Sequence, residues 1–148
     1  MLAACIQERV ERFQVPADLP SPRDRESLSK LLISFGAKLL REVTDPTVIA
    51  TFRLAIAEAV NAPEVARALD SIGREASRST LCKIMTEAVA SGLLEGSPAK
   101  LGEQFSALLF GDLIVSLLLR VAPQPTPREC ARRARGAAAA FLKLHQPS

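Results

Sequence analysis

The residues that could bind or transform another molecule are few, and they interrupt otherwise apolar helical stripes. Arg53 and Glu58 lie in the segment TVIATFRLAIAEAVN, and Asp112 lies on an apolar side of the segment 97–121. A charge that is withdrawn from water needs a partner, so the pattern favours an internal ion pair or a hydrogen bond to a helix end. The functional alternative is a polar anchor in a mostly apolar ligand cavity between helices.

Large apolar side chains accompany these charges and could form the walls of such a cavity. Met and Phe are suited to this role because they make adaptable apolar surfaces. They would suit a plain hydrophobic core as well, which is the more common use of any one of them. The candidate ligand-binding residues are Phe35, Phe52, Arg53, Met85, Phe105, Leu109 and Asp112.

The sequence contains no recognisable catalytic or metal-binding pattern. His145 is the one histidine and lies near the end of the chain, which argues against a Ser-His-Asp triad and against a His-rich metal site. There is no Glu-x-x-His pattern and no G-x-G-x-x-G loop. We therefore predict no metal, no cofactor and no enzymatic activity, and an enzyme built in a helical bundle is the weakest hypothesis.

The thiols and the first residues bear on where the protein works. Cys5, Cys82 and Cys130 are odd in number and far apart, which favours reduced thiols over a disulfide framework or a zinc site. The opening MLAACIQERV already carries Glu8 and Arg9, unlike a signal peptide. These features predict a cytoplasmic protein.

Composition points to helices. Hydrophobic residues make up 48% of the 148 residues but aromatic residues only 4%, with no Trp or Tyr. Such a chain packs through Leu, Ala, Ile and Val, whereas a β-sandwich relies on aromatic and β-branched strands. No run of period-two alternation predicts a strand. We expect one all-α domain over residues 1–148, a bundle of about six helices.

Helix starts are marked by a capping residue followed closely by proline. These pairs are Ser21-Pro22, Asp45-Pro46, Asn61 with Pro63, Ser97-Pro98 and Thr126-Pro127, the last with Glu129 placed for a capping box. They predict helices over 22–44, 46–60, 63–89, 97–121 and 127–144. The third has a soft point at Gly73. Helical spacing of apolar residues adds a helix over residues 1–14.

The segment 97–121 has apolar residues on two opposite sides, which a helix that covers one core does not need. It is no membrane span, because Glu103, Asp112 and Arg120 divide it. It lies either between a core and a partner or at the centre of a large core, and we favour a partner. The last helix has a small-sided stripe typical of close helix packing, although alanine also occurs simply as the best helix former. The candidate homodimer interface is Phe110, Ile114, Leu117, Val121, Ala134, Ala138 and Phe141.

Basic residues cluster in the last helix, although the net charge is only +3. The cluster is Arg128, Arg132, Arg133 and Arg135, with Lys143 further along. A solvated helix face is the favoured interpretation, and binding of phosphate or of an acidic partner is the minor one.

The order of these segments resembles a known family. The run DPTVIATFRLAIAEA at residues 45–59, the helix start at residues 63–66, the segment 90–94, the apolar helix 105–119 and residues 140–142 resemble the C-terminal domain of tetracycline-repressor (TetR) family transcriptional regulators. The resemblance covers nearly the whole chain.

The resemblance implies an all-helical domain that binds a small apolar or amphipathic effector and dimerises through its last two long helices as a four-helix bundle. It also implies that effector binding changes the spacing of two recognition helices in an N-terminal helix-turn-helix module. That spacing matters because the two half-sites lie roughly 34–36 Å apart on DNA.

The chain departs from the family pattern at its beginning, where no helix-turn-helix module precedes the helix over residues 1–14. We interpret that helix as the remnant of the connection to a missing DNA-binding module, in a fragment or in a shortened relative. The first hypothesis is the effector-binding and dimerisation domain of a TetR-like repressor. The alternative is a stand-alone helical module that binds other proteins and does not bind DNA.

Overall fold

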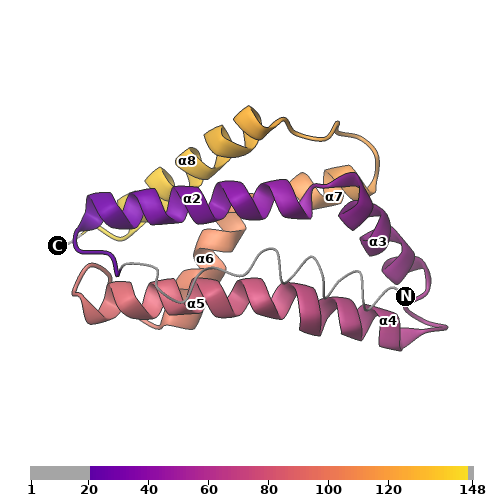
Figure 1. Ribbon diagram of the computed structural model, residues 1–148, viewed down its shortest axis with the longest axis horizontal. Helices are drawn as coiled ribbons and strands as arrows, with labels where there is room; N and C mark the ends of the chain where they lie inside the picture. The colour runs from indigo at the N-terminus through magenta and orange to yellow at the C-terminus, as the bar shows by residue number, and fades with distance from the viewer. Residues whose placement is uncertain (1–20, 147–148) are drawn as a thin grey trace.

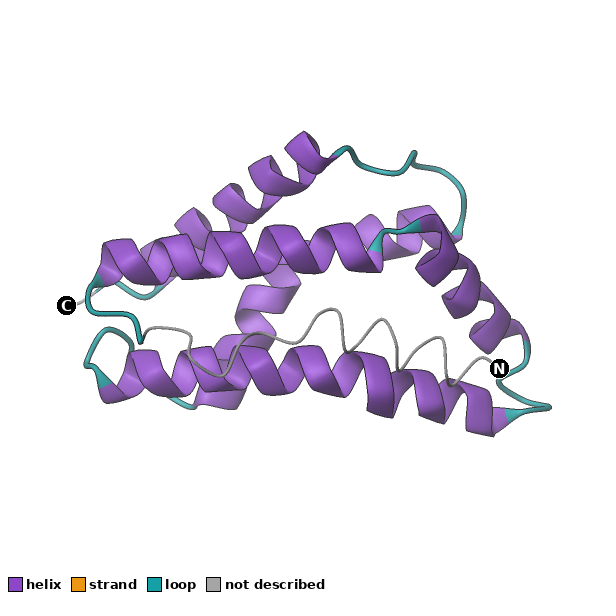
Figure 2. Ribbon diagram, viewed as in Figure 1, coloured by secondary structure: helices purple, strands orange, loops and turns teal. Residues whose placement is uncertain are grey.

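The computed structural model describes residues 21–146, apart from the side chains of residues 72 and 73, and these residues form helices joined by loops, with no strand (Figure 2). The predicted all-α fold is confirmed. The helix expected over residues 1–14 and the thiol of Cys5 lie outside the described residues.

Two long helices lie side by side and form one layer of the molecule. Helix α2 spans Arg25–Val43 and helix α8 spans Pro127–Leu144. Figure 1 shows α8 running along α2, with the C-terminus beside the start of α2. Helix α2 begins three residues later than the Ser21-Pro22 pair predicted, because Asp24 caps it by accepting a 2.7 Å hydrogen bond from the amide of Ser27.

On the other side of the molecule, α3 (Pro46–Ala57) and a loop lead into one continuous helical segment from Pro63 to Ala90. Helix α3 turns away from the end of α2. Helix α4 (Pro63–Ala68), a π-helical turn (Leu69–Arg74) and α5 (Glu75–Ala90) then follow without a break. The predicted soft point at Gly73 falls in the π-helical turn, where the backbone hydrogen bonds skip one residue more than in an α-helix.

The prediction of one unbroken helix over residues 97–121 is wrong. The segment is divided into α6 (Pro98–Phe110) and α7 (Leu113–Leu118). Gly111 ends α6 with a φ of +50°, a conformation that glycine adopts readily because it has no Cβ. The apolar pattern continues across this break, and so the sequence alone did not reveal it.

Helix α6 crosses between α5 and the α2–α8 layer (Figure 1), and the core lies around this crossing. The rings of Phe105 and Phe141 meet edge to face with centroids 5.8 Å apart. Burial of each large side chain contributes about 1.5–3 kcal/mol. The largest fully buried apolar side chains are Phe105, Phe141, Leu28, Leu32, Leu40, Met85 and Leu109. No helix within residues 21–146 has the length and hydropathy needed to cross a bilayer.

Candidate effector cavity and helix-end arginines

A cavity of about 1270 Å³ lies between helices α2, α3, α5, α6 and α7. Its walls are mostly apolar, which is typical of sites for small organic ligands. The larger apolar residues that line it are Leu39, Val43, Val48, Phe52, Leu69, Leu81, Phe110 and Ile114. Neutral polar groups come from Thr47, Thr51, Ser77, Ser79, Cys82, Thr86 and Ser106.

Several charged residues at the cavity are already paired with neighbours. Arg74 contacts Asp70 at 2.9 Å, and Arg78 contacts Glu75 at 2.6 Å. The carboxylate of Glu87 accepts a hydrogen bond from Ser21. These pairs are exposed enough to contribute little stability. Glu42, Lys83 and Glu103 also line the cavity, so charged residues of both signs lie among the hydroxyl groups and the apolar walls.

Of the candidate ligand-binding residues, Phe52 lines this cavity. Phe35, Met85, Phe105 and Leu109 belong instead to the hydrophobic core. Their side chains fill the space where α6 meets α2, α5 and α8, so little or none of their surface is accessible. For these four residues the structure agrees with the alternative of a plain core.

The charged candidates either lie at a helix end or contact one. Arg53 donates from Nε to the carbonyl of Leu118 at 3.1 Å and from Nη2 to the carbonyl of Leu117 at 2.7 Å. This contact matches the helix-end alternative. Asp112 is exposed at the start of α7 and makes no side-chain capping hydrogen bond there. Glu58 is exposed at the end of α3. None of the three is among the described residues that line the cavity.

The candidate interface residues are distributed over three environments. Phe110 and Ile114 line the cavity, and Leu117 is 6% exposed. Ala134, Ala138 and Phe141 are completely buried in the core of the same protomer, and Val121 is exposed.

Leu117, Ala134, Ala138 and Phe141 are thus buried within one protomer and do not face a partner there. For the half-buried Phe110 and Ile114 and the exposed Val121, the interface stays a prediction. The small-sided stripe of α8 packs on α2. The exposed large apolar side chains of this region are Leu108, before the break at Gly111, and Val115, Leu119 and Val121 after it.

Two further arginines bind helix C-termini. Arg133 donates to the carbonyls of Leu109 and Phe110, both at 2.8 Å, and so holds the end of α6. It departs from the predicted solvated cluster, whereas Arg128, Arg132 and Arg135 are exposed as expected. A cation at a helix C-terminus is stabilised by the carbonyls and by the helix dipole.

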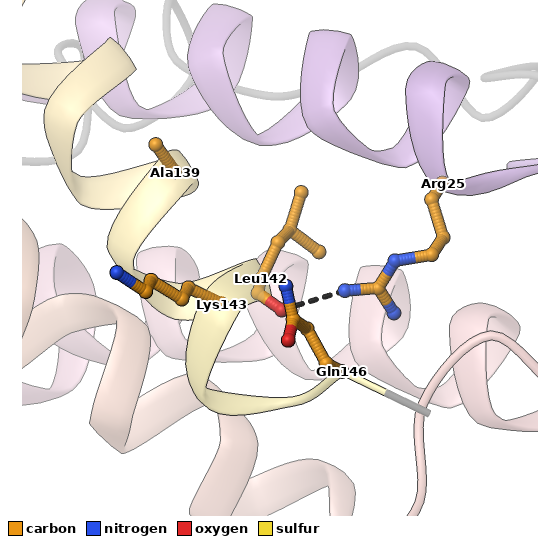
Figure 3. Close-up of a pocket in the computed structure, with 5 residues that line it drawn as sticks. All are labelled: Arg25, Ala139, Leu142, Lys143 and Gln146. Atoms are coloured by element: carbon orange, nitrogen blue, oxygen red, sulfur yellow. Dashed lines mark hydrogen bonds between the residues drawn. The ribbon is translucent and has the colours of Figure 1, made fainter. Parts of the chain in front are cut away.

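Arg25 makes the third contact of this kind, at the end of α8. Its Nη2 donates to the carbonyl of Leu142 at 2.6 Å, and its Nη1 donates to that of His145 at 3.0 Å. Figure 3 shows the guanidinium of Arg25 directed at Leu142 beside a hollow of about 620 Å³ that Lys143 and Gln146 also line. Because the guanidinium of Arg25 already donates to these carbonyls, its role here is to cap the end of α8, and we do not treat the hollow as a ligand site.

The described residues form an all-helical domain with a mostly apolar cavity between its helices. Residues 30–147 match the family model of the C-terminal domain of AefR-like transcriptional repressors. The chain belongs to this family, and the resemblance to TetR-family regulators is confirmed.

Solved structures agree with this placement. The chain is similar to a TetR transcriptional regulator from Agrobacterium tumefaciens, with 24% identity, a TM-score of 0.83, and coverage of 99% of this chain and 72% of that one. It is also similar to the flavonoid-responsive regulator FrrA, with 28% identity, a TM-score of 0.76, and coverage of 98% and 73%. No curated protein matches the chain.

Proposed function

We propose that this domain senses a small effector for a transcriptional repressor and that the cavity between α2, α3, α5, α6 and α7 is the effector site. The observation that carries the proposal is a large, mostly apolar cavity in a member of a repressor family. The whole domain, residues 1–148, acts as one sensing and dimerising unit.

The lining of the cavity suits a neutral effector. Charged lining residues carry both signs, with Arg74 and Arg78 paired to carboxylates. The hydroxyls of Thr47, Thr51 and Ser106 provide hydrogen bonds without charge. The full charged set is Arg74, Arg78, Lys83, Glu42, Glu75, Glu87 and Glu103. A charged effector would lose hydration that the apolar walls do not replace. The related FrrA is flavonoid-responsive by name, and neutral aromatic molecules with hydroxyl groups suit such a lining.

The effector acts by a shift between two helix arrangements. An effector that prefers one arrangement by about 1–3 kcal/mol changes DNA affinity about 5- to 150-fold. In this proposal a helix-turn-helix module makes the contact with DNA.

Binding is tested by thermal shift against a library of neutral amphipathic compounds that includes flavonoids. A ligand at 100 times its dissociation constant adds about 2.7 kcal/mol of stability. The variant Ser106→Trp fills the cavity with an indole and abolishes the shift, whereas Ser91→Trp, on an exposed residue outside the cavity, keeps it. A ligand that stabilises both variants equally binds elsewhere and contradicts the site.

The domain also forms a homodimer through exposed apolar residues of α6, of α7 and of the segment that follows α7, together with the solvent face of α8. These residues are Leu108 in α6, Val115 in α7, and Leu119 and Val121 after it. Leu119 is 67% exposed, so Leu119→Asp disrupts association without disturbing the core. Leu54→Asp is the matched control, on an apolar residue of α3 that is 50% exposed.

Light scattering distinguishes the outcomes. A monomeric Leu119→Asp variant and a dimeric Leu54→Asp variant support the surface. A dimer in both variants places the interface elsewhere. A monomeric wild-type chain that also binds no compound favours the alternative of a module that binds other proteins.

A further inference from the structure

Helix α7 is too short to be stable by itself. It has six residues, Leu113–Leu118, whereas isolated helices shorter than about 12 residues are marginal in water. Leu117 is its one buried residue. The position of α7 therefore depends on contacts with other elements.

The end of α7 has a backbone conformation that is unfavourable for the residue present. The amide of Arg120 donates to the carbonyl of Leu117 at 3.2 Å, and the amide of Val121 donates to that of Ser116 at 3.0 Å. These two bonds form a Schellman motif, which places Arg120 at a φ of +60°. Glycine is usual at this position because a Cβ is crowded there.

Arg53 of α3 holds this helix end. Its guanidinium spans the carbonyls of Leu117 and Leu118 with two hydrogen bonds of 2.7 and 3.1 Å. The carbonyl of Leu117 thus accepts from both Arg53 and the amide of Arg120. A planar guanidinium can make both contacts at once, whereas a lysine ammonium provides a single point of charge.

The two elements joined by Arg53 are both walls of the cavity. Phe52, adjacent to Arg53 in α3, lines it, and so does Ile114 of α7. Val115 of α7 and Leu119, the residue that follows α7, are exposed to solvent. An occupant of the cavity therefore contacts the two helices that Arg53 connects.

We propose that Arg53 is the positioning residue that couples occupancy of the cavity to the end of α7 and its exposed apolar face. The proposal rests on the proposed effector site. A displacement of α3 by an occupant changes the two hydrogen bonds from Arg53. Because the end of α7 is already in an unfavourable conformation, the stability of its terminal hydrogen bonds then changes.

The test fills the cavity covalently and so needs no known effector. Cys82 is a free, half-buried thiol that lines the cavity, and Cys130 is fully buried. With Cys5→Ser in the 148-residue chain, monobromobimane is attached at Cys82 and full labelling is verified by mass. The control carries Cys82→Ser and Glu95→Cys, which places the same label on an exposed residue outside the cavity.

The readout is amide hydrogen exchange at Arg120 and Val121, measured by NMR. With Arg53 present, the Cys82 label changes these rates about fivefold or more in either direction, and the Glu95→Cys label leaves them unchanged. In Arg53→Met the rates no longer depend on the label, and in Arg53→Lys the dependence is reduced. The amide of His145, at the end of α8 held by Arg25, does not respond in any variant.

A label-dependent change that persists in Arg53→Met overturns the proposal, as does the absence of any change in the fully labelled protein that retains Arg53. Should Arg53→Met not fold, Arg53→Lys is judged by the same criterion of a reduced dependence. Because occupancy is verified by mass, failure of this coupling is distinguishable from failure of the effector site, which is tested by library binding.

Discussion

Gly36 of α2 faces Ala134 of α8 so closely that even a methyl group added to Gly36 would make the neighbouring side chains shift. A Cβ placed on Gly36 would lie 3.3 Å from the Cβ of Ala134 and 3.1 Å from Cδ1 of Leu109. The small-sided stripe of α8 therefore serves close packing, as the sequence predicts, but the neighbour is α2 of the same protomer.

Replacing Gly36 with alanine is expected to destabilise the domain. Ala134 and Leu109 are completely buried in a close-packed core and would have to shift, so we expect overpacking to outweigh the better helix propensity of alanine by about 1 kcal/mol. Gly136→Ala is the control on α8, since no atom lies within 4 Å of its added Cβ, and it should stabilise by about 0.5–1 kcal/mol. Urea unfolding measures both, and equal stability of Gly36→Ala and wild type would contradict the close packing.

Removing the cap of α8 should cost stability, whereas removing the corresponding hydroxyl at α6 should not. Thr126 accepts a 3.1 Å hydrogen bond from the amide of Glu129, but Ser97 makes no side-chain capping bond. We expect Thr126→Ala to lower the free energy of unfolding by about 1 kcal/mol. Thermal unfolding of both variants measures the difference. A comparable loss in Ser97→Ala would show that the hydroxyl of Ser97 also caps its helix.

The same capping box makes stability depend on pH. The hydrogen bond from the backbone amide of Thr126, and then that from its side chain, hold the pKa of Glu129 below its ordinary value of 4.5. A carboxylate with a lowered pKa in the folded state stabilises the protein above the ordinary value, and this contribution is lost as the pH falls through the folded value.

We expect Glu129→Gln to reduce the loss of stability between pH 5 and pH 3. Some loss should remain, because the pKa of Asp24 is also lowered, chiefly by its hydrogen bond from the Ser27 amide. Unfolding measured at a series of pH values provides the comparison. An unchanged pH dependence in Glu129→Gln would mean that the capping bond does not form in solution.

Arg133 should matter far more than its neighbours in the basic cluster. Its guanidinium satisfies the last carbonyls of α6, so Arg133→Met leaves them without that partner and should cost about 1–2 kcal/mol. Arg132→Met removes an exposed charge and should change stability by less than about 0.5 kcal/mol. Chemical denaturation of the two variants checks this, and equal effects would argue against the helix-end contact.

The local signals in the sequence were reliable where one short segment determines the outcome. The proline-marked starts of α3, α6 and α8 occur at Pro46, Pro98 and Pro127, because a fixed φ and a missing amide suit a first helical residue wherever it lies. The start of α2 was placed too early, since Asp24 and Ser27 cap the helix after Pro22.

The candidate sites could be predicted only in part, because burial depends on which helix covers which stripe. An apolar stripe is the same in sequence whether it faces a core, a cavity or a partner, and so Phe105 and Phe52 were grouped together although one is in the core and the other lines the cavity. Arg53 was recognised as a charge that needs a partner, but its partner is a carbonyl group 64 residues away.

The sequence by itself determined the all-helical class, the family and most helix starts, because composition, periodicity and capping act within a few turns of one helix. Tertiary structure alone decided that α8 packs on α2, that Gly111 divides α6 from α7, and that Arg25, Arg53 and Arg133 hold helix ends. The packing of α8 on α2 and the three arginine contacts depend on atoms from segments far apart in the chain, which the spacing of residues does not encode. The break at Gly111 is a local turn of the backbone, but an apolar pattern that continues across it conceals it.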